Sequence, residues 1–166
     1  MASLRVLLLS HNRLTVTPAG IGKLGKLNTV HLSYNQLGTV LPPEFGALTS
    51  LVSLELEGNS FVRPPPIVID QGCEVLIEYL SRVLEARSSR LLFMDNMKLP
   101  FFPPEMMDMP TLTGLSMADN QLEELDPVIG TFTCLTALHL DRNRLTLLPS
   151  SVGNLTRLGK RASECV

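Results

Sequence analysis

Hydrophobic residues recur along the chain at a fixed spacing, L-x-x-L-x-L-x-x-N, in which the last position is asparagine. The segment that starts at Leu135 shows this spacing most clearly. Five clear copies start at Leu4, Leu27, Leu51, Leu112 and Leu135. Copies that follow one another without an insertion are 23 or 24 residues apart. Such a period predicts a fold of stacked repeats, because only neighbouring copies can bury the leucines of each copy.

Each copy has two halves with different expected structures. The alternating leucines of L-x-L predict a short β-strand, and stacked copies then predict a parallel sheet. The asparagine follows the strand at a turn, and its amide can both donate and accept hydrogen bonds. We therefore expect a column of asparagines to satisfy backbone groups of these turns. The second half, P-x-x-[IVF]-x-x-L, predicts an irregular return on the outer side, whose apolar residues close the core.

A sixth copy starts near Ser89 and is less regular than the others. Its strand leucine positions hold Leu92 and Met94. Its asparagine position holds Met97, and Asn96 comes one residue too early. We expect a local distortion of this turn.

The third and fourth copies are separated by an insertion at about residues 64–88. The prolines at 64–66 predict an extended approach, because proline restricts its own backbone and that of the preceding residue. Asp70 is a candidate N-cap for the helix that follows. One face of this helix is apolar, with Val75, Leu76, Tyr79, Leu80, Val83 and Leu84. We interpret it as a structural helix on the convex side, with a docking helix for a partner as the alternative.

The composition is that of a folded and mainly aliphatic protein. Hydrophobic residues make up 45% of the 166 residues and tryptophan is absent, so the core must consist mostly of leucine. The formal net charge of −2 does not favour nucleic acid or a membrane surface as a partner. Cys73, Cys134 and Cys165 have no metal-binding or paired spacing. Reduced thiols and a cytoplasmic location are therefore expected.

The repeat resembles the leucine-rich repeat of the intracellular, 23-residue type, as in the Ras-group and Shoc-2-like scaffold family. The resemblance implies an α/β fold, a right-handed leucine-rich-repeat solenoid with a concave parallel β-sheet, an irregular or 3-10 convex side and one helical insertion. It implies a single domain over residues 1–166. Its repeats would start near residues 4, 27, 51, 89, 112 and 135, with an irregular tail at 159–166. The insertion resembles a phrase of the same family at Gly58, Asn59, Pro65, Ile69, Gly72, Leu76, Tyr79 and Leu80.

Binding residues are expected on the concave face, where the strand positions between the core leucines point outward. The candidate residues for binding a protein partner are His31, Tyr34, Glu55, Glu57, Phe93, Asp95, Asp119, His139, Asp141 and Arg142. Their five carboxylates would form an acidic strip that favours a basic partner surface. Phe93, Tyr34 and His139 are the expected anchors, because aromatic residues tend to dominate contact energies. The alternative is a solvated polar face that binds nothing.

No catalytic or cofactor motif accompanies the repeats. HExxH, GxSxG, GxGxxG and GxxxxGK[ST] are absent. The acidic strip lacks the glycine-centred loop of an EF-hand. We therefore expect neither an enzyme nor a cofactor or metal site. The expected function is a non-catalytic protein–protein interaction module, a signalling adaptor or scaffold in the cytoplasm. By the resemblance, its partner would be a protein with a basic surface or a small GTPase.

The ends of the chain suggest an alternative. The first repeat starts at Leu4 without a polar cap, and the last complete repeat ends at Leu158. Solenoids normally shield their end repeats, so uncapped ends predict either self-association or missing sequence. The alternative function is therefore the repeat portion, or a truncated isoform, of a larger kinase- or GTPase-linked signalling protein.

Overall fold

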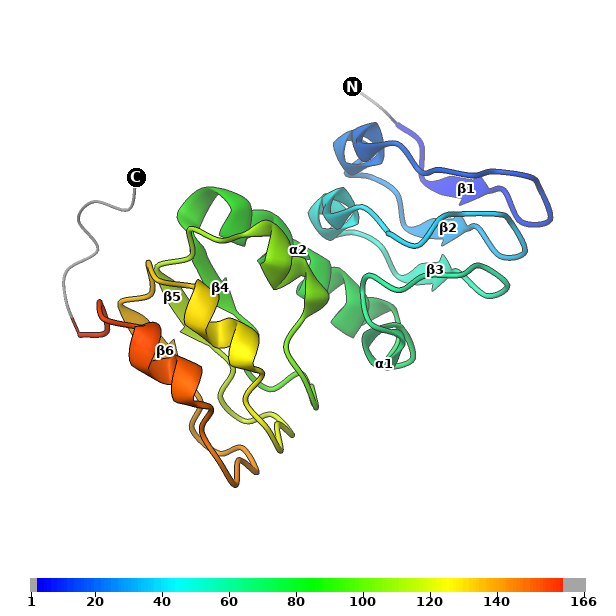
Figure 1. Cartoon of the computed structure of the whole chain (residues 1–166). Coiled ribbons are helices and arrows are strands. Elements are labelled where there is room, and N and C mark those ends of the chain that lie inside the picture. The colour runs from blue at the N-terminus through cyan, green and yellow to red at the C-terminus, as the bar shows by residue number, and fades with distance from the viewer. Residues whose placement is uncertain (1–2, 160–166) are drawn as a thin grey trace. The chain divides into compact units, whose positions relative to one another are not determined.

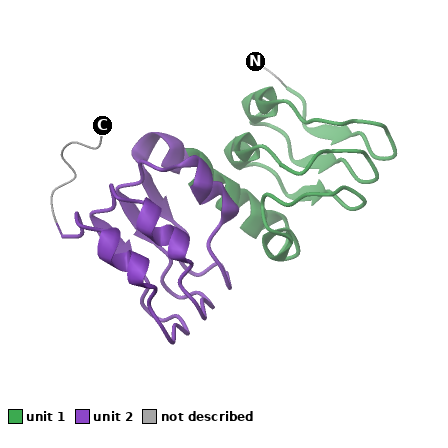
Figure 2. Cartoon of the chain, in the orientation of Figure 1, with its two compact units in different colours: residues 1–84 green, residues 85–166 purple. Residues whose placement is uncertain are grey.

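The structure, a computed structural model, describes residues 3–159 (Figure 1). The chain forms two compact units, residues 1–84 and residues 85–166, which are coloured separately in Figure 2. The boundary between the units lies inside the long helix α2 (Cys73–Ser89). Of the irregular tail expected at 159–166, all but Gly159 lies outside the described residues.

Unit 1 contains the first three repeats and most of the insertion. Its elements are the strands β1 (Val6–Leu8), β2 (Thr29–His31) and β3 (Ser53–Glu55), the 3-10 helices η1 (Ala19–Lys23) and η2 (Pro43–Ala47), the short helix α1 (Pro66–Ile69) and the first part of α2. The strands form one parallel sheet in the order β1-β2-β3. Their register aligns Leu7, Val30 and Leu54, which occupy the same position of the repeat pattern.

Unit 2 begins within α2 and contains the last three repeats. Its elements are the strands β4 (Leu91–Phe93), β5 (Gly114–Ser116) and β6 (Ala137–His139) and the 3-10 helices η3 (Pro104–Asp108), η4 (Pro127–Thr131) and η5 (Ser150–Asn154). The strands form a second parallel sheet in the order β4-β5-β6. The aligned leucines here are Leu92, Leu115 and Leu138.

These elements confirm the fold class expected from the sequence, with parallel strands, 3-10 returns and one helical insertion. The sequence favours one sheet through all repeats, whereas the strands form two sheets of three. The insertion separates β3 from β4 along the chain. Met97 also stands at the asparagine position of the fourth repeat, and its thioether cannot donate a hydrogen bond as an asparagine amide does.

Each unit buries an aliphatic core between its strands and its 3-10 helices. In unit 1 the fully buried residues include Leu27, Val30, Leu32, Phe45 and Leu48. In unit 2 they include Leu92, Met94, Leu99, Met106 and Ile129. Val30 and Leu115, in the central strands, are 0% and 1% exposed, whereas Leu54 in the edge strand β3 is only half-buried. The residue at this position is therefore fully buried in the central strand of each sheet, as the stacked arrangement favours.

The turn after each strand has the same unusual backbone conformation in all six repeats. The residue before the asparagine position has a positive φ, between 53° and 71°, at His11, Tyr34, Gly58, Asn96, Asp119 and Arg142. This left-handed region is unfavourable for most residues other than glycine and asparagine. In the irregular fourth repeat, Asn96 occupies this position and Lys98 also has a positive φ, 55°. The distortion expected in the fourth repeat is therefore a second residue, Lys98, whose backbone has a left-handed conformation.

The asparagines form the predicted hydrogen-bonded column. The side-chain amide of Asn35 donates to Leu9 O and Leu32 O, both at 2.9 Å, and its Oδ1 accepts from Leu14 N at 3.0 Å. It therefore joins its own repeat to the preceding one. Asn59, Asn120 and Asn143 make the equivalent bonds.

Within the insertion, helical structure begins before Asp70, the residue expected to cap its amino end. Pro66 is the first residue of α1, where its missing N–H costs nothing and its fixed φ suits a helix. Asp70 is the C-cap of α1, and its N–H donates to Pro66 O. The expectation that Asp70 caps the amino end of a helix is therefore wrong, because the proline starts helical structure one turn before it. A further helix, α2, starts at Cys73 after Gly72, whose φ is +97°.

The apolar face of α2 is close to the predicted one. Leu76, Tyr79, Leu80 and Val83 are at most 2% exposed. Val75 and Leu84 are half-buried instead, and Ile77 and Ala86 are buried although they do not belong to the predicted face. Within unit 1, α2 approaches η2 so closely that a Cβ added to Gly46 would lie 2.2 Å from Ser81 N. Glycine is required here by the close approach of two backbones.

Candidate functional site

The candidate residues lie on the outward side of the strands and of the turns that follow them, which we call the strand face of each unit. Unit 1 contributes His31, Tyr34, Glu55 and Glu57. Unit 2 contributes Phe93, Asp95, Asp119, His139, Asp141 and Arg142. Of the acidic strip expected from the sequence, Glu55 and Glu57 therefore belong to unit 1, and Asp95, Asp119 and Asp141 belong to unit 2.

On the strand face of unit 1, Tyr34 is exposed but held in place. Its ring stacks on that of His11, with centroids 4.7 Å apart and an angle of 11° between the ring planes. Its hydroxyl donates to Glu57 Oε1 at 3.0 Å, and this hydrogen bond to a carboxylate raises the pKa of Tyr34. Gly58 leaves room for the ring, because a Cβ there would lie 2.6 Å from Tyr34 Cδ1. An exposed aromatic ring is therefore fixed by its neighbours from the two adjoining repeats.

A second cluster on the same face surrounds His31. Its Nε2 lies 3.2 Å from Ser53 Oγ and 3.5 Å from Glu55 Oε1. Both partners belong to β3, the next strand of the sheet. Neither Ser53 nor His11 is among the site residues expected from the sequence. His11 could have been found, because it occupies the position of Tyr34 one repeat earlier.

On the strand face of unit 2, Arg142 and Asp119 form a two-pronged ion pair. Arg142 Nε and Nη2 donate to the two carboxylate oxygens of Asp119 at 2.5 and 2.6 Å. The hydrogen bonds from the guanidinium lower the pKa of Asp119, and the carboxylate in turn raises the pKa of Arg142. The negative charge of Asp119 is therefore offset by Arg142 and is not available to a partner as a free carboxylate.

Asp95 has a structural role in unit 2. Its Oδ1 accepts a hydrogen bond from Ser116 Oγ at 2.6 Å and another from Ala118 N at 2.7 Å. Ser116 is only 6% exposed, so this carboxylate is directed toward the neighbouring strand. Of the predicted acidic residues in unit 2, Asp141 is thus the one whose carboxylate is most open to a partner.

Tyr34 and Phe93 are both exposed candidate anchors. Tyr34 is 48% exposed in unit 1, and Phe93 is 50% exposed in unit 2. Leu8, in the equivalent position of β1, is 62% exposed and extends the apolar part of the unit 1 face. Each strand face therefore combines a large apolar side chain with charged neighbours, which is a common composition for a protein-binding surface.

The cysteines differ in part from the expectation of reduced thiols. Cys73 is a free thiol whose burial raises its pKa. Cys134 is disulfide-bonded, a pairing that spacing along the chain could not indicate. Within residues 3–159, no three His, Cys, Asp or Glu side chains are grouped so that they could hold a metal ion. None of the helices in this range is both long and apolar enough to cross a membrane.

The repeat geometry agrees with the comparison with protein families. Models of the leucine-rich repeat match residues 2–61 and residues 134–155. The chain is a leucine-rich repeat protein. Proteins of this class generally act as interaction modules, and neither matching family is enzymatic.

Two leucine-rich repeat relatives of this chain are much longer than it. The chain is 33% identical over 160 residues to the human leucine-rich repeats and immunoglobulin-like domains protein 1, covering 93% of this chain and 13% of the relative. It is 32% identical over 88 residues to the Caenorhabditis elegans leucine-rich repeat serine/threonine-protein kinase 1, covering 51% of this chain and 4% of the relative. The chain thus spans less than a sixth of either relative.

A solved structure of a leucine-rich repeat protein from Leptospira interrogans is similar to this chain. The sequence identity is 26% and the TM-score is 0.45. The match covers 95% of this chain and 42% of the other.

Proposed function

We propose that this leucine-rich repeat chain is a non-catalytic module that binds a protein partner through its strand faces, as a signalling adaptor or scaffold. The observation that carries the proposal is the fixed position of an exposed aromatic ring. Tyr34 is about half exposed, yet its ring stacks on His11 and its hydroxyl is bonded to Glu57. A solvated face without a binding role has no need of such restraint.

Restraint of this kind favours binding for an entropic reason. Association usually costs about 0.5–1.5 kcal/mol for each flexible side chain that it immobilises. Tyr34 is already held before a partner arrives, so most of that cost is avoided. Buried aromatic side chains also contribute most of the binding energy in many interfaces. Tyr34 and, in unit 2, Phe93 are therefore the proposed anchors.

The charges around the anchors favour a basic partner surface. Glu55 and Glu57 are exposed in unit 1, and Asp141 is exposed in unit 2. Carboxylates at the rim of an interface steer an oppositely charged partner and fix its register. His31, His139 and the Asp119–Arg142 pair supply further polar contacts. The resemblance to Ras-group scaffolds makes a small GTPase the first partner to test.

A second candidate function is the repeat portion of a larger signalling protein. The similarity to the Caenorhabditis elegans protein named leucine-rich repeat serine/threonine-protein kinase 1 favours it, since this chain spans only 4% of that relative. In that case the strand faces would still bind a protein, and catalysis would belong to another part of the longer chain.

The experiment that tests the proposal removes the anchors. The full chain and its Tyr34→Ala/Phe93→Ala variant are used to capture partners from a cell extract, and each captured protein is purified and titrated. We expect the double variant to bind the partner roughly tenfold or more weakly. Phe101→Ala is the matched control, because Phe101 is 48% exposed and does not belong to a strand face. Equal affinity of all three proteins would contradict the proposal.

A further inference from the structure

Four polar side chains of unit 1 line a hollow near the start of its strands, which we call the basic hollow. Arg5 and Asn28 directly precede β1 and β2, while Lys26 and Ser50 lie shortly before β2 and β3. The hollow has a volume of about 320 Å³. Its lining includes two cations and no carboxylate. None of the four residues belongs to the strand face, and all of them lie within the first three repeats.

The side chains of the basic hollow have no partners in the chain. Among the described residues, none of the four makes a hydrogen bond or an ion pair through its side chain. Asn28 is the clearest case, because its Oδ1 is buried and has no donor. By contrast, the amides of Asn35 and Asn59 in the same unit are fully engaged. A buried polar group without a partner is uncommon in proteins and calls for an explanation such as a ligand.

The corresponding place in unit 2 has no such set of unpaired charges. Arg90 occupies the repeat position of Arg5 and lines a smaller hollow of about 100 Å³. The charged residues of that hollow are Arg87, Arg90 and Asp108, and each has an interaction partner. The repeat fold therefore does not itself require two unpaired cations at this position.

Asn28 also differs from its equivalents in unit 2. Thr113 and Thr136 occupy the same position of the repeat. The hydroxyl of Thr113 donates to Arg90 O at 3.3 Å, and that of Thr136 donates to Thr113 O at 3.0 Å. Each threonine thus bonds to the preceding repeat, whereas the side chain of Asn28 does not. The amide of Asn28 is therefore available to a group from outside the chain.

The charge of the first two repeats favours an anion at this place. Residues 1–43 contain four Lys or Arg residues and no Asp or Glu, although the whole chain has a net charge of −2. A local excess of one sign attracts ligands of the opposite sign. The basic hollow therefore lies in a cationic part of an otherwise slightly acidic protein.

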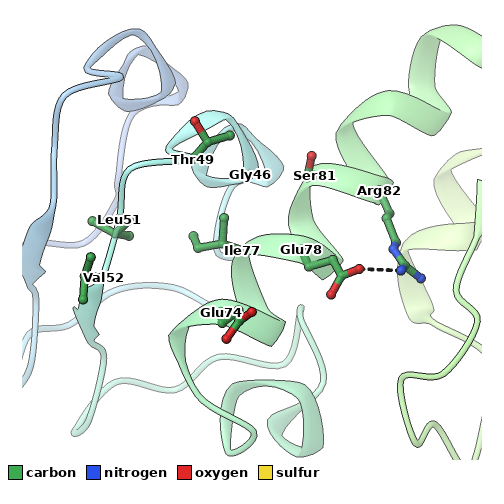
Figure 3. Close-up of a pocket in the computed structure, with 9 residues that line it drawn as sticks. All are labelled: Gly46, Thr49, Leu51, Val52, Glu74, Ile77, Glu78, Ser81 and Arg82. Carbon is green, nitrogen blue, oxygen red and sulfur yellow. Dashed lines mark hydrogen bonds and ion pairs between the residues drawn. The ribbon is translucent and has the colours of Figure 1, made fainter.

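A larger hollow of unit 1 does not share this character. It has a volume of about 670 Å³ and lies between α2 and the chain that leads into β3 (Figure 3). Its cation, Arg82, is paired with Glu78, and Glu74 also lines it. An anion would be repelled there, so the smaller basic hollow is the candidate anion site.

We propose that the basic hollow binds a phosphorylated serine or threonine side chain of a partner protein. A phosphate monoester carries a charge of about −1.5 to −2 and three acceptor oxygens. Arg5 and Lys26 offset that charge, and the Ser50 hydroxyl and the Asn28 amide supply further donors. A carboxylate carries only one negative charge and would leave more of the positive charge uncompensated. A phosphate group therefore fits the four side chains better than an acidic side chain does.

The size and charge of the basic hollow favour a protein ligand over a membrane. Its volume is at the lower end of the range of about 300–1,000 Å³ that is usual for ligand pockets, which suits one compact group. Membrane surfaces are typically bound by clusters of about 4–8 Lys or Arg residues, whereas two line this hollow. The inference rests on the proposed function in one respect, since it takes the partner to be a protein. It concerns residues outside the strand faces, so the two sites can be tested separately.

The probe is a capped hexapeptide of alanine and glycine with one phosphoserine, compared with the same peptide carrying serine or glutamate at that position. Each peptide is titrated into the full chain at low ionic strength while backbone amides are followed by NMR. We expect the phosphoserine peptide to bind roughly tenfold or more tightly than either of the others. The largest shifts should occur at the amides of Lys26, Asn28 and Ser50. Equal affinity of the three peptides, or shifts confined to other residues, would overturn the proposal.

Variants of the lining residues test the site directly. Arg5→Gln/Lys26→Gln should bind the phosphoserine peptide roughly tenfold or more weakly. Arg13→Gln/Lys23→Gln is the matched control, because it removes the same charge at exposed residues that do not line the hollow. Asn28→Thr introduces the residue type that unit 2 has at this position, so it should keep the circular dichroism spectrum and still weaken binding. An equal loss in the control pair, or unchanged affinity of the first pair, would overturn the proposal.

Two further measurements separate this site from the alternatives. Tyr34→Ala/Phe93→Ala should bind the phosphoserine peptide like the wild type, so a failure of the strand faces and a failure of the basic hollow give different results. A loss of peptide binding in that variant would overturn the proposal, because the phosphate would then bind at a strand face. Vesicles of phosphatidylcholine and phosphatidylserine test a membrane as the ligand. Co-sedimentation with these vesicles that Arg5→Gln/Lys26→Gln abolishes would also overturn the proposal.

Discussion

The side chain of Asn120 accepts a hydrogen bond from the backbone N–H of Met97 at 3.2 Å. Met97 occupies the asparagine position of the fourth repeat and cannot make this type of bond with its own side chain. Asn120 also accepts from Leu99 N at 2.9 Å and donates to Met94 O at 2.7 Å. The fifth repeat therefore satisfies the turn of the irregular fourth repeat, which explains how the pattern can lose one asparagine.

The asparagine column should be a main source of stability. Asn120 is 6% exposed, and its replacement by leucine leaves several buried backbone groups without partners. We expect Asn120→Leu to lower the free energy of unfolding by about 1–3 kcal/mol, and Asn143→Leu by a similar amount. Chemical denaturation measures both. Asn12→Leu is the control, since Asn12 is exposed and bonds only within its own repeat. An equal loss for Asn12 would contradict this role of the column.

The contact between α2 and η2 should depend on the absence of a side chain at position 46. A methyl group on Gly46 would lie 2.2 Å from Ser81 N and 2.5 Å from Leu80 C, both backbone atoms. We expect Gly46→Ala to destabilise the protein by about 1–3 kcal/mol, as overpacking usually does. Thermal unfolding followed by circular dichroism tests this. In Gly20→Ala, the added Cβ meets nothing within 4 Å, so that variant should unfold close to the wild type.

The Tyr34–Glu57 hydrogen bond predicts a shifted titration. The bond to the carboxylate raises the pKa of Tyr34 above its ordinary value of 10.0. Below that value the tyrosine is protonated in both folded and unfolded chains, so the bond contributes its full stability. This contribution is lost as the pH rises from 10.0 through the higher pKa of the folded state. Glu57→Gln should lower the pKa of Tyr34, measured from its ring resonances. An unchanged pKa would show that the bond does not form.

The single domain expected from the sequence can be tested through α2. This helix is continuous across the boundary after Leu84, with Val83 buried on one side and Ala86 on the other. Unfolding of one unit would expose part of the helix that the other unit needs. We therefore expect a single calorimetric transition for the full chain. Two separate transitions would contradict a single cooperative domain.

The repeat pattern predicted most of the fold because its physical constraints are local. L-x-L places alternate side chains on two faces, and an asparagine at a fixed distance can reach the same backbone groups in every copy. The face of α2 was predicted almost completely for the same reason, since helical periodicity alone decides which of Leu76, Leu80 and Val83 are buried. The start of α1 was not predicted, because Pro66 and Asp70 are both residues that can mark the start of a helix.

The site was harder to predict, because it depends on pairs of residues from different repeats. Asp119 and Arg142 are 23 residues apart and occupy the same position in two neighbouring repeats. Their pairing could therefore have been predicted from the repeat spacing. The positive φ of Tyr34 and of Arg142 could not have been predicted from the sequence, because neither residue type favours that backbone conformation. The division into two sheets of three strands could not be predicted either, because the repeat pattern is the same before and after the insertion.

The central claim is that the strand faces bind a protein with a basic surface. The most direct measurement is the affinity of the purified partner for the full chain and for Glu57→Lys/Asp141→Lys, which reverses an exposed carboxylate on each face. Glu123→Lys/Glu124→Lys makes the same change in net charge at exposed residues away from the strand faces. We expect the first variant to bind roughly tenfold or more weakly, with an unchanged circular dichroism spectrum, and the second to bind like the wild type. Unchanged affinity of the first variant, or an equal loss in both, would contradict the claim.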